Sequence, residues 1–420
     1  DTAGNIGGSA SDNISLDTVV PDNTTVSINS GDNLTKLTAV TLKLGASDSN
    51  KVKGYYASEQ TSTPALSNFI QVTESTLYSD NVSFNLSSGD GVKRVYVWFR
   101  DKAGNISNSV SDNITLDQTA PVLAEVTAVP LLDNDSTPNY IFSSTETGTL
   151  SYGGSCSSAT TQANENNNTI TLNTLAEGTY NNCTLSVTDS AENISDNLSF
   201  TTFTVDLTTP ALSLVSAVST YTNDTTPNLT FSSSENGTIS YGGSCSSSTT
   251  QAISGNNVVT LSTLTEGIYD NCTISVVDGA GNLSGALTVD NFTVDVTSPT
   301  LSLGSPSSSL TKSGPVTFTV SYTGASTVSL STDNVTVSST DNASAGSTLV
   351  SSSGTGTRTV TLSNLAGDGT LSISLASGTA SDEAGNQALS AGPSGSFTVD
   401  NSGPSGTVAI AKEVQNTDNT

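Results

Sequence analysis

Hydrophobic and polar positions alternate with a period of two along most of the chain. In one stretch, Cys272, Ile274 and Val276 alternate with Thr273 and Ser275. Strands that bury one face and expose the other show this alternation, which is typical of antiparallel sheets. Roughly seven such runs, separated by turn residues, occur in every stretch of about 90 residues, and no amphipathic helical pattern is found. The pattern therefore predicts an all-β fold of β-sandwiches.

Whole sequence phrases recur at a fixed spacing. Pro121, Pro210 and Pro299 stand 89 residues apart, and TGTLSYGGSCSS reappears as NGTISYGGSCSS. A fixed period of this length indicates a tandem array of similar domains. A D-x-A-x-N phrase closes each unit, beginning at Asp1, Asp101, Asp189, Asp278 and Asp382. The predicted units are 18–117, 118–206, 207–295 and 296–400, with the end of a preceding repeat at 1–17 and the first strand of a following repeat at 401–420.

The composition argues against an enzyme. Hydrophobic residues make up 34% of the chain, below the roughly 45–50% of typical globular domains. The chain contains no histidine, which removes Ser-His-Asp triads, histidine metal ligands and the commonest general base. Paired carboxylates could serve a glycosidase, but no glutamate recurs where a cleft is expected. We therefore expect no enzymatic activity.

The net charge of −27 narrows the range of partners. Such a chain repels the phosphates of nucleic acids and the headgroups of anionic lipids. No run approaches the roughly 18 apolar residues of a membrane span. We therefore expect neither nucleic-acid binding nor direct membrane insertion.

The end of each unit resembles a known family of repeats. D-x-A-G-N, then a strand, then V-D-x-T-x-P is similar to the tandem bacterial Ig-like repeats of large extracellular adhesins and biofilm-associated surface proteins. The resemblance implies a linear array of Ig-like antiparallel β-sandwiches that is extracellular, non-enzymatic and often carries Ca²⁺ at domain junctions. A T-L-x-E-G-x-Y phrase ending at Tyr180 and Tyr269 also resembles the tyrosine corner of Ig-like domains, with the tyrosine three residues before the cysteine instead of two.

The four cysteines form two pairs within single units. Cys156 and Cys183, like Cys245 and Cys272, are separated by 27 positions, and no C-x-x-C is present. In an Ig-like topology the first cysteine falls near the end of strand C and the second near the start of strand F. These strands are antiparallel neighbours, so the two ends meet. We expect Cys156–Cys183 and Cys245–Cys272 disulfides, which place the protein outside a reducing cytoplasm.

The recurring aspartates have two interpretations. Asparagine, aspartate and glycine form tight turns without any metal, whereas several carboxylates and carbonyls that converge at a junction suit Ca²⁺, which takes six to eight oxygens. Within one unit, the last strand lies between the D-x-A-x-N turn and the aspartate at the end of the unit, so these two groups lie at opposite ends of the sandwich. A junction site must therefore combine groups from two neighbouring units. The possible Ca²⁺ ligands are Asp101, Asn105, Asp117, Asp135, Asp189, Asn193, Asp206, Asp224, Asp278, Asn282, Asp295, Asp382, Asn386 and Asp400.

The first unit differs from the others because it holds the only tryptophan and eight of the eleven basic residues. The alternation places Tyr96 and Trp98 on an outer sheet face, flanked by Arg94 and Arg100. Such side chains dominate binding energies in interfaces, so they could form an interaction patch. Alternatively, an extra strand or the long connection at 57–80 covers them.

The sequence thus predicts a structural function. Almost no linker separates the units, and a proline soon after each junction aspartate restricts the backbone there. We expect a stiff extracellular rod that acts as an adhesin stalk or as the building block of a surface fibre. Two alternatives remain: a filament or sheath subunit assembled by strand pairing, and an adhesin whose first repeat binds a ligand. The expected partners are further repeats or copies of the same protein and a cell-surface or polysaccharide ligand.

Overall fold

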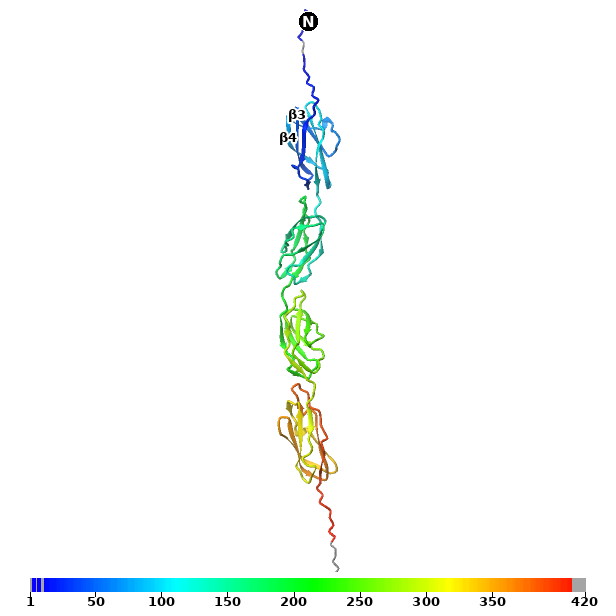
Figure 1. The fold of residues 1–420 in the computed structure, drawn as a ribbon, viewed down its shortest axis with the longest axis vertical. Helices are drawn as coiled ribbons and strands as arrows, with labels where there is room; N and C mark the ends of the chain where they lie inside the picture. Colours follow the sequence, from blue (N-terminus) through cyan, green and yellow to red (C-terminus); the bar gives the residue numbers. More distant parts are fainter. Residues whose placement is uncertain (1, 5, 9–10, 410–420) are drawn as a thin grey trace, which may run out of the picture. The chain divides into compact units, whose positions relative to one another are not determined.

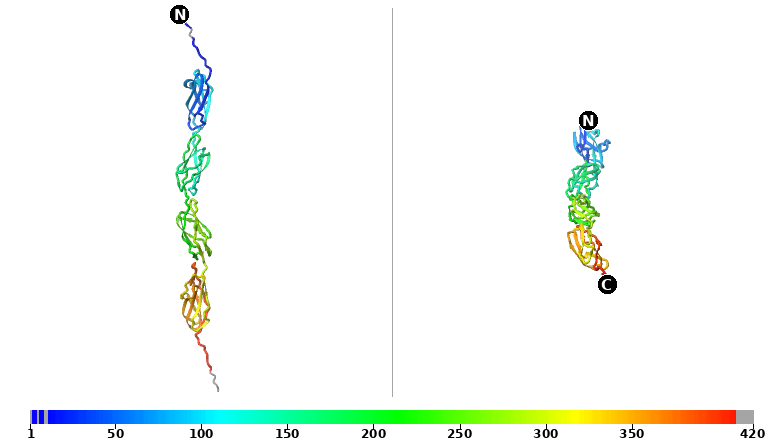
Figure 2. Two further views of the ribbon diagram at one scale, coloured as in Figure 1. Left: turned by 60° about the vertical axis from the view of Figure 1, so that its left-hand side comes forward. Right: turned by 60° about the horizontal axis from the view of Figure 1, so that its bottom comes forward.

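The computed structural model describes residues 2–4, 6–8 and 11–409, and within them the regular structure consists of β-strands and two short 3₁₀ turns. These described residues contain four separate hydrophobic cores, one within each predicted unit between 18 and 400. The chain divides into two compact units, Asp1–Leu207 and Thr208–Thr420, and each contains two of these cores. Figures 1 and 2 show each core as its own group of strands packed in two layers. The fold class is therefore all-β, with Ig-like β-sandwiches.

In the first sandwich the strands follow the order β1-β3-β5-β6-β2, and β4 also pairs with β3. The long strand β3 changes partners along its length: its first half pairs with β1, and from Val52 onward it pairs with β5. Its register shifts between Ser47 and Val52. The elements are β1 (Asp22–Ile28), β2 (Leu34–Thr35), β3 (Ala39–Ser58), η1 (Leu66–Asn68), β4 (Ile70–Asn85), β5 (Gly91–Asp101) and β6 (Val110–Leu116).

The second sandwich consists of three small sheets, in the orders β12-β9-β7, β11-β10-β14-β15 and β13-β16-β8. Its core packs around the fully buried rings of Tyr140, Phe142 and Phe203. The strands are β7 (Leu123–Thr127), β8 (Leu132–Asp133), β9 (Asn139–Ser144), β10 (Gly148–Gly153), β11 (Gln162–Ala163), β12 (Asn166–Thr171), β13 (Gly178–Tyr180), β14 (Thr184–Thr188), β15 (Leu198–Ser199) and β16 (Phe203–Val205).

The third sandwich repeats this topology with sheets β17-β19-β22, β21-β20-β24-β25 and β18-β26-β23. The repeated sequence therefore produces repeated strand pairing. The strands are β17 (Leu212–Ser216), β18 (Tyr221–Thr222), β19 (Asn228–Ser233), β20 (Gly237–Gly242), β21 (Gln251–Ala252), β22 (Gly255–Thr260), β23 (Gly267–Tyr269), β24 (Thr273–Val277), β25 (Leu287–Thr288) and β26 (Phe292–Val294).

The fourth sandwich has longer strands, in sheets β27-β29-β33-β32, β28-β36-β34-β31 and β30-β35. It contains neither cysteine nor the YGGSCSS phrase. The elements are β27 (Thr300–Leu303), β28 (Leu310–Thr311), β29 (Val316–Thr323), β30 (Thr327–Val328), η2 (Thr332–Asn334), β31 (Val335–Ser339), β32 (Ser344–Ser352), β33 (Thr357–Ala366), β34 (Gly369–Leu375), β35 (Ala380–Ser381) and β36 (Phe397–Val399).

Each sandwich also contains one parallel pairing, which the alternation in the sequence does not predict. A two-residue strand near the start of the sandwich lies parallel to its last long strand, as β2 does with β6 and β8 with β16. The pairs β18 with β26 and β28 with β36 are also parallel. These short strands tie the beginning of each sandwich to the strand that leads into the next linker.

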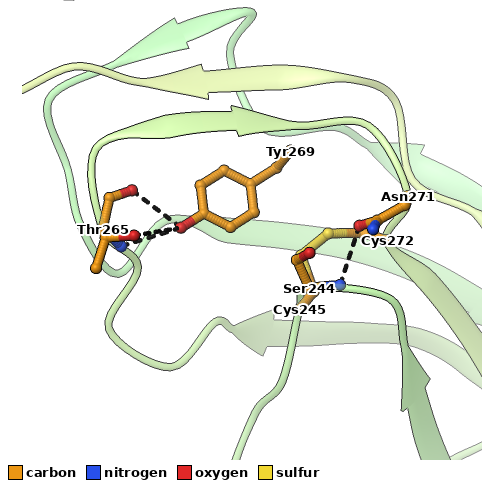
Figure 3. Close-up of a disulfide and its surroundings, with 6 residues drawn as sticks. All are labelled: Ser244, Cys245, Thr265, Tyr269, Asn271 and Cys272. Carbon is orange, nitrogen blue, oxygen red and sulfur yellow. Dashed lines mark hydrogen bonds between the residues drawn. A yellow bond between two sulfur atoms is a disulfide. The ribbon is translucent and has the colours of Figure 1, made fainter.

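The structure contains the Cys156–Cys183 and Cys245–Cys272 disulfides, each closing a separation of 27 residues. In the third sandwich, Cys245 follows β20 and Cys272 precedes β24, and these two strands are antiparallel neighbours. The N–H of Ser244 donates to Asn271 Oδ1 at 2.9 Å beside the bond, as Figure 3 shows.

The tyrosine corner lies close to the same disulfide. The hydroxyl of Tyr269 donates to the carbonyl of Thr265 at 2.9 Å and accepts the N–H of Thr265 at 3.0 Å (Figure 3). In the second sandwich, the Tyr180 hydroxyl donates to the Ala176 carbonyl in the same way. The sequence phrase therefore serves the same local function in both sandwiches.

Residues 12–17, DNISLD, alternate as the closing strand of a preceding repeat would, and such a strand needs the rest of its repeat to pair with. Residues 11–17 form no strand, and Ile14 and Leu16 are 92% and 87% exposed. The physical reason is that no described strand lies beside this segment to pair with it. Residues 401–409 likewise form no strand, while Asp1 and Asn5 of the first D-x-A-x-N phrase and residues 410–420 lie outside the described residues.

Replacing Cys245 and Cys272 by alanine should lower the free energy of unfolding of the third sandwich by about 3 kcal/mol, because a loop of this size is no longer closed in the unfolded chain. Hydrogen exchange read by mass spectrometry resolves each sandwich separately. The fourth sandwich, which has no cysteine, is the internal control. Equal loss of protection in both sandwiches would contradict a bond confined to the third.

Candidate cation site at the linker aspartates

The D-x-A-x-N phrase forms a tight turn around its own aspartate. At the end of β5, Asp101 Oδ1 accepts the N–H groups of Gly104 and Asn105 at 2.7 and 2.8 Å. The side-chain amide of Asn105 donates to the other carboxylate oxygen, Oδ2, at 2.7 Å. Gly104 has a φ of 99°, which glycine adopts without strain. Turn chemistry alone therefore accounts for the residue types in the phrase.

The asparagine of each turn also holds the linker that enters the sandwich. The amide of Asn105 donates to the backbone carbonyl of Asp17 at 3.1 Å. The same bond joins Asn193 to the Asp117 carbonyl at 3.0 Å and Asn386 to the Asp295 carbonyl at 2.7 Å. The linker aspartate is thereby placed beside the turn aspartate of the following sandwich. This is the combination of neighbouring units that a junction site requires.

A third acidic side chain completes the group at two of these places. Asp48, in the irregular part of β3, joins Asp17 and Asp101, and Glu146, in the turn after β9, joins Asp117 and Asp189. Within each group, one carboxylate oxygen from every residue lies within 4.8 Å of the others. We call these sets the Asp48 cluster and the Glu146 cluster.

The Asp48 cluster is the more buried of the two and contains unsatisfied oxygens. Asp48 is only 6% exposed, and its Oδ1 accepts the N–H of Asn50 at 2.7 Å. Its Oδ2 and the Oδ2 of Asp17 are both buried without any hydrogen-bond partner. Buried polar atoms are nearly always paired. Two orphaned carboxylate oxygens in one group are therefore acceptors that a cation or a proton would satisfy.

The pKa shifts follow from this crowding. Burial raises the pKa of the Asp48 carboxyl, and the negative charges of Asp101, Asp17 and Asp22 raise it further. The hydrogen bond from the N–H of Val19 lowers the pKa of Asp17, so this group stays ionised. In the described part of the chain, no lysine or arginine forms an ion pair with the Asp48 cluster.

The Glu146 cluster shows the same type of electrostatics. Burial raises the pKa of Glu146, and Asp117, Asp189 and Asp90 add to the effect. The two clusters have the same composition in chemical terms: a linker aspartate, a turn aspartate and one further acid. Such oxygen-only groups favour hard cations such as Ca²⁺.

Several residues predicted from the sequence stay outside both clusters. Asp135 and Asp224 accept the N–H groups of Thr137 and Thr226 within their own turns, and Asp400 accepts the N–H of Ser402. The turns that contain Asp135 and Asp224 therefore supply no ligand to either cluster.

In the third sandwich the D-x-A-x-N turn forms in the same way, with the N–H of Asn282 donating to Asp278 Oδ1 at 2.8 Å and its amide donating to Oδ2 at 2.9 Å. The backbone N–H of Asp206 donates to the Asp133 carbonyl.

Conversely, sequence reasoning missed Asp48 and Glu146. Glu146 carries a usable signal, because Glu235 occurs 89 residues later in the matching phrase before G-T. Asp48 carries none, because the first unit lacks this phrase and the acid lies where the register of β3 shifts.

The predicted patch of Arg94, Tyr96, Trp98 and Arg100 requires a correction. Trp98 is only 3% exposed: its indole lies against the rings of Tyr56, on β3, and Tyr96, and Phe69 in the connection before β4 packs against Tyr56. Arg100 lies over the Phe69 ring at 5.6 Å. Tyr96 is half-buried and Arg94 is exposed. The covering connection, which was the alternative interpretation, is the arrangement found.

Comparisons with known proteins give only distant likenesses. No family model and no curated protein matches the chain. Among solved structures, the D00-D0 domain of intimin is 14% identical with a TM-score of 0.24, over 42% of this chain and 99% of that one. The structure titled invasin, a bacterial integrin-binding protein, is 13% identical with a TM-score of 0.28, over 90% and 78%. The N-terminal eight Ig domains of Down Syndrome Cell Adhesion Molecule are 10% identical with a TM-score of 0.24, over 90% and 55%.

These TM-scores are too low to support a conclusion about function. The described residues contain no helix with the length and hydrophobicity that a membrane span requires.

Replacing Asp48 with asparagine should stabilise the first sandwich in calcium-free buffer at neutral pH, by about 1 kcal/mol. The raised pKa of Asp48 means that its ionised form destabilises the folded state, so stability falls as the pH rises through that pKa. The gain should therefore vanish below about pH 4, where the wild-type carboxyl is protonated in both states. Urea unfolding followed by Trp98 fluorescence measures this gain in the free energy of unfolding, since Trp98 is the only tryptophan.

The control for this experiment is Asp32→Asn, at an exposed aspartate of the same sandwich. It removes one negative charge outside the cluster and should change stability by only a few tenths of a kcal/mol. A loss of stability on Asp48→Asn at neutral pH without calcium would show that the charge is not a source of repulsion.

Proposed function

We propose that the chain is a non-enzymatic extracellular structural protein, in which Ig-like repeats form a stiff rod that acts as an adhesin stalk or as the building block of a surface fibre. The observation that carries this proposal is the bond from the turn asparagine to the linker aspartate, which holds the linkers entering the first, second and fourth sandwiches against those domains. A chain built to transmit or resist force needs linkers with few free torsions.

The linker between the first two sandwiches is held from both sides. From the first sandwich, Asp90 accepts the N–H of Gln118 at 2.8 Å and the hydroxyl of Thr119. From the second, Asn193 binds the Asp117 carbonyl. These bonds leave the residues between the two domains little conformational freedom, which supports a stiff array of domains over a flexible one.

A further contact crosses the same junction. The Lys36 ammonium of the first sandwich donates to the carbonyl of Glu192 at 2.8 Å, and its Nζ lies 3.7 Å from the Glu192 carboxylate. Because the glutamate side chain is exposed, the ion pair adds little stability. The contact between Lys36 and Glu192 restricts how the first two sandwiches are oriented more than it stabilises them.

Calcium has a defined place in this proposal. Three carboxylates converge at each cluster, and the Asp48 cluster contains two buried oxygens without a partner. Ca²⁺ would bind these oxygens, remove the repulsion among the acids and lock the linker aspartate to the sandwich that follows it. Extracellular fluids supply such a cation, and disulfides such as those in the second and third sandwiches persist outside a reducing cytoplasm.

The partners under this proposal are further repeats or copies of the same protein and a cell-surface or polysaccharide ligand that the rod presents or reaches. The alternative in which the first repeat itself binds a ligand through Trp98 loses its main residue to burial. The strongly acidic surface keeps nucleic acids and anionic membranes among the disfavoured partners.

Calcium should make the full chain longer and stiffer in solution. Small-angle scattering in millimolar calcium should give a larger maximum dimension than scattering in chelator, because the repelling acids at the junctions are then bridged. Glu146→Gln should reduce this response, since it removes one of three ligands between the first two sandwiches.

The control is Asp196→Asn, which removes an exposed carboxylate of the second sandwich that belongs to neither cluster. It should retain the full response to calcium. Identical wild-type profiles with calcium and with chelator would leave the junction aspartates as turn and linker residues only.

A further inference from the structure

The third acid of each cluster occupies one defined structural position. The residue after the linker proline pairs with Ser47 in the first sandwich, bonds to Thr145 in the second and pairs with Thr323 in the fourth. The next residue along the chain is then Asp48, Glu146 and Gly324, respectively. We call this place the third-acid position. In the fourth sandwich it is therefore occupied by a glycine.

The bonds of the turn asparagine are the same in the fourth sandwich, although Gly324 takes a positive φ that Asp48 and Glu146 do not. Asn386 donates to the Asp295 carbonyl at 2.7 Å and to Asp382 Oδ2 at 2.9 Å, which is the arrangement found around Asn105 and Asn193. Among the described residues of this unit, no third acid joins Asp295 and Asp382. A cavity of about 500 Å³ lies there instead, and its lining includes Thr323, Gly324 and both aspartates.

We propose that the residue at the third-acid position decides whether a junction binds a divalent cation, and that the junction before the fourth sandwich does not respond to calcium. This inference rests on the proposed function, in which calcium locks the acidic clusters. Ca²⁺ takes six to eight oxygens, and its affinity depends on the number of charged ligands. With Gly324 in place, one of the three carboxylates is missing among the described residues.

The consequence is a rod with unequal joints. The linker at Asp117 stiffens when calcium binds, whereas the linker at Asp295 keeps only its hydrogen bonds. Those bonds include the one from Asn386 and one from the Thr297 hydroxyl to Glu266, at 2.8 Å. The fourth sandwich can therefore change its orientation independently of calcium while the junction at Asp117 is locked.

The structure allows a gain-of-function test at Gly324. A Cβ built on this glycine meets only the Cα of Pro299, at 3.9 Å, so a side chain has room. The φ of Gly324 is 80°, a conformation that aspartate and asparagine tolerate better than most residues. Gly324→Asp supplies the missing carboxylate, and Gly324→Asn is the matched control because it has the same size and backbone cost without the charge.

The experiment measures distance distributions across two junctions of the full chain. Fluorophores on non-natural amino acids, which leave the disulfides intact, are placed on the first and second sandwiches in one sample and on the third and fourth in another. Single-molecule energy transfer is recorded with CaCl₂ and with chelator. In wild type, calcium should narrow the first distribution at least severalfold more than the second. Gly324→Asp should make the second distribution respond, and Gly324→Asn should not.

The outcomes separate the two proposals. If the wild-type junction before the fourth sandwich narrows as much as the first junction, the role of Gly324 is refuted while calcium locking stands. If folded Gly324→Asp, checked by circular dichroism, gains no response beyond that of Gly324→Asn, the third-acid position does not decide binding. If neither wild-type junction responds, calcium locking itself fails, and this inference fails with it.

Discussion

The side-chain amide of one asparagine fixes how the chain enters a sandwich. In the first, second and fourth sandwiches this amide donates both to the carboxylate of its own turn and to the backbone carbonyl of the linker aspartate. The linker begins directly after a strand of the preceding domain, as Asp117 follows β6. Because both ends of the linker are held within a few residues, the position of its carboxylate is determined by the backbone. The acidic clusters exist because of this constraint.

Gathering three carboxylates in partly buried surroundings is unfavourable unless something positive balances them. Burial raises the pKa of both Asp48 and Glu146, and the negative charges of the neighbouring acids raise it further. A protein that needed only turns would not require the third acid, since Gly324 takes its place in the fourth sandwich without disturbing the bonds of Asn386. The third acid thus adds a property that folding does not demand, and cation binding is the property that its chemistry favours.

Much of the architecture follows from the sequence, because it depends on short-range pattern and repetition. Alternation predicts the strands. The paired cysteines of an Ig-like topology predict disulfides beside the adjacent ends of β10 and β14 and of β20 and β24. The features that the sequence does not predict depend on pairing between distant segments. Asp48 reaches its cluster only through a shift in register within β3, and Trp98 lies on a nominally outer face that a connection happens to cover. Residues 12–17 have the pattern of a strand but form none, because a strand also needs a neighbour to pair with.

The most direct test of cation binding at the Asp48 cluster is a crystal structure of the chain grown in calcium, with an anomalous difference map. The account predicts a peak between Asp17, Asp48 and Asp101, with carboxylate oxygens at about 2.3–2.6 Å and six to eight oxygen ligands in total. The two orphaned oxygens should be among these ligands. A map without a peak at this place, from crystals grown in calcium, would contradict the account.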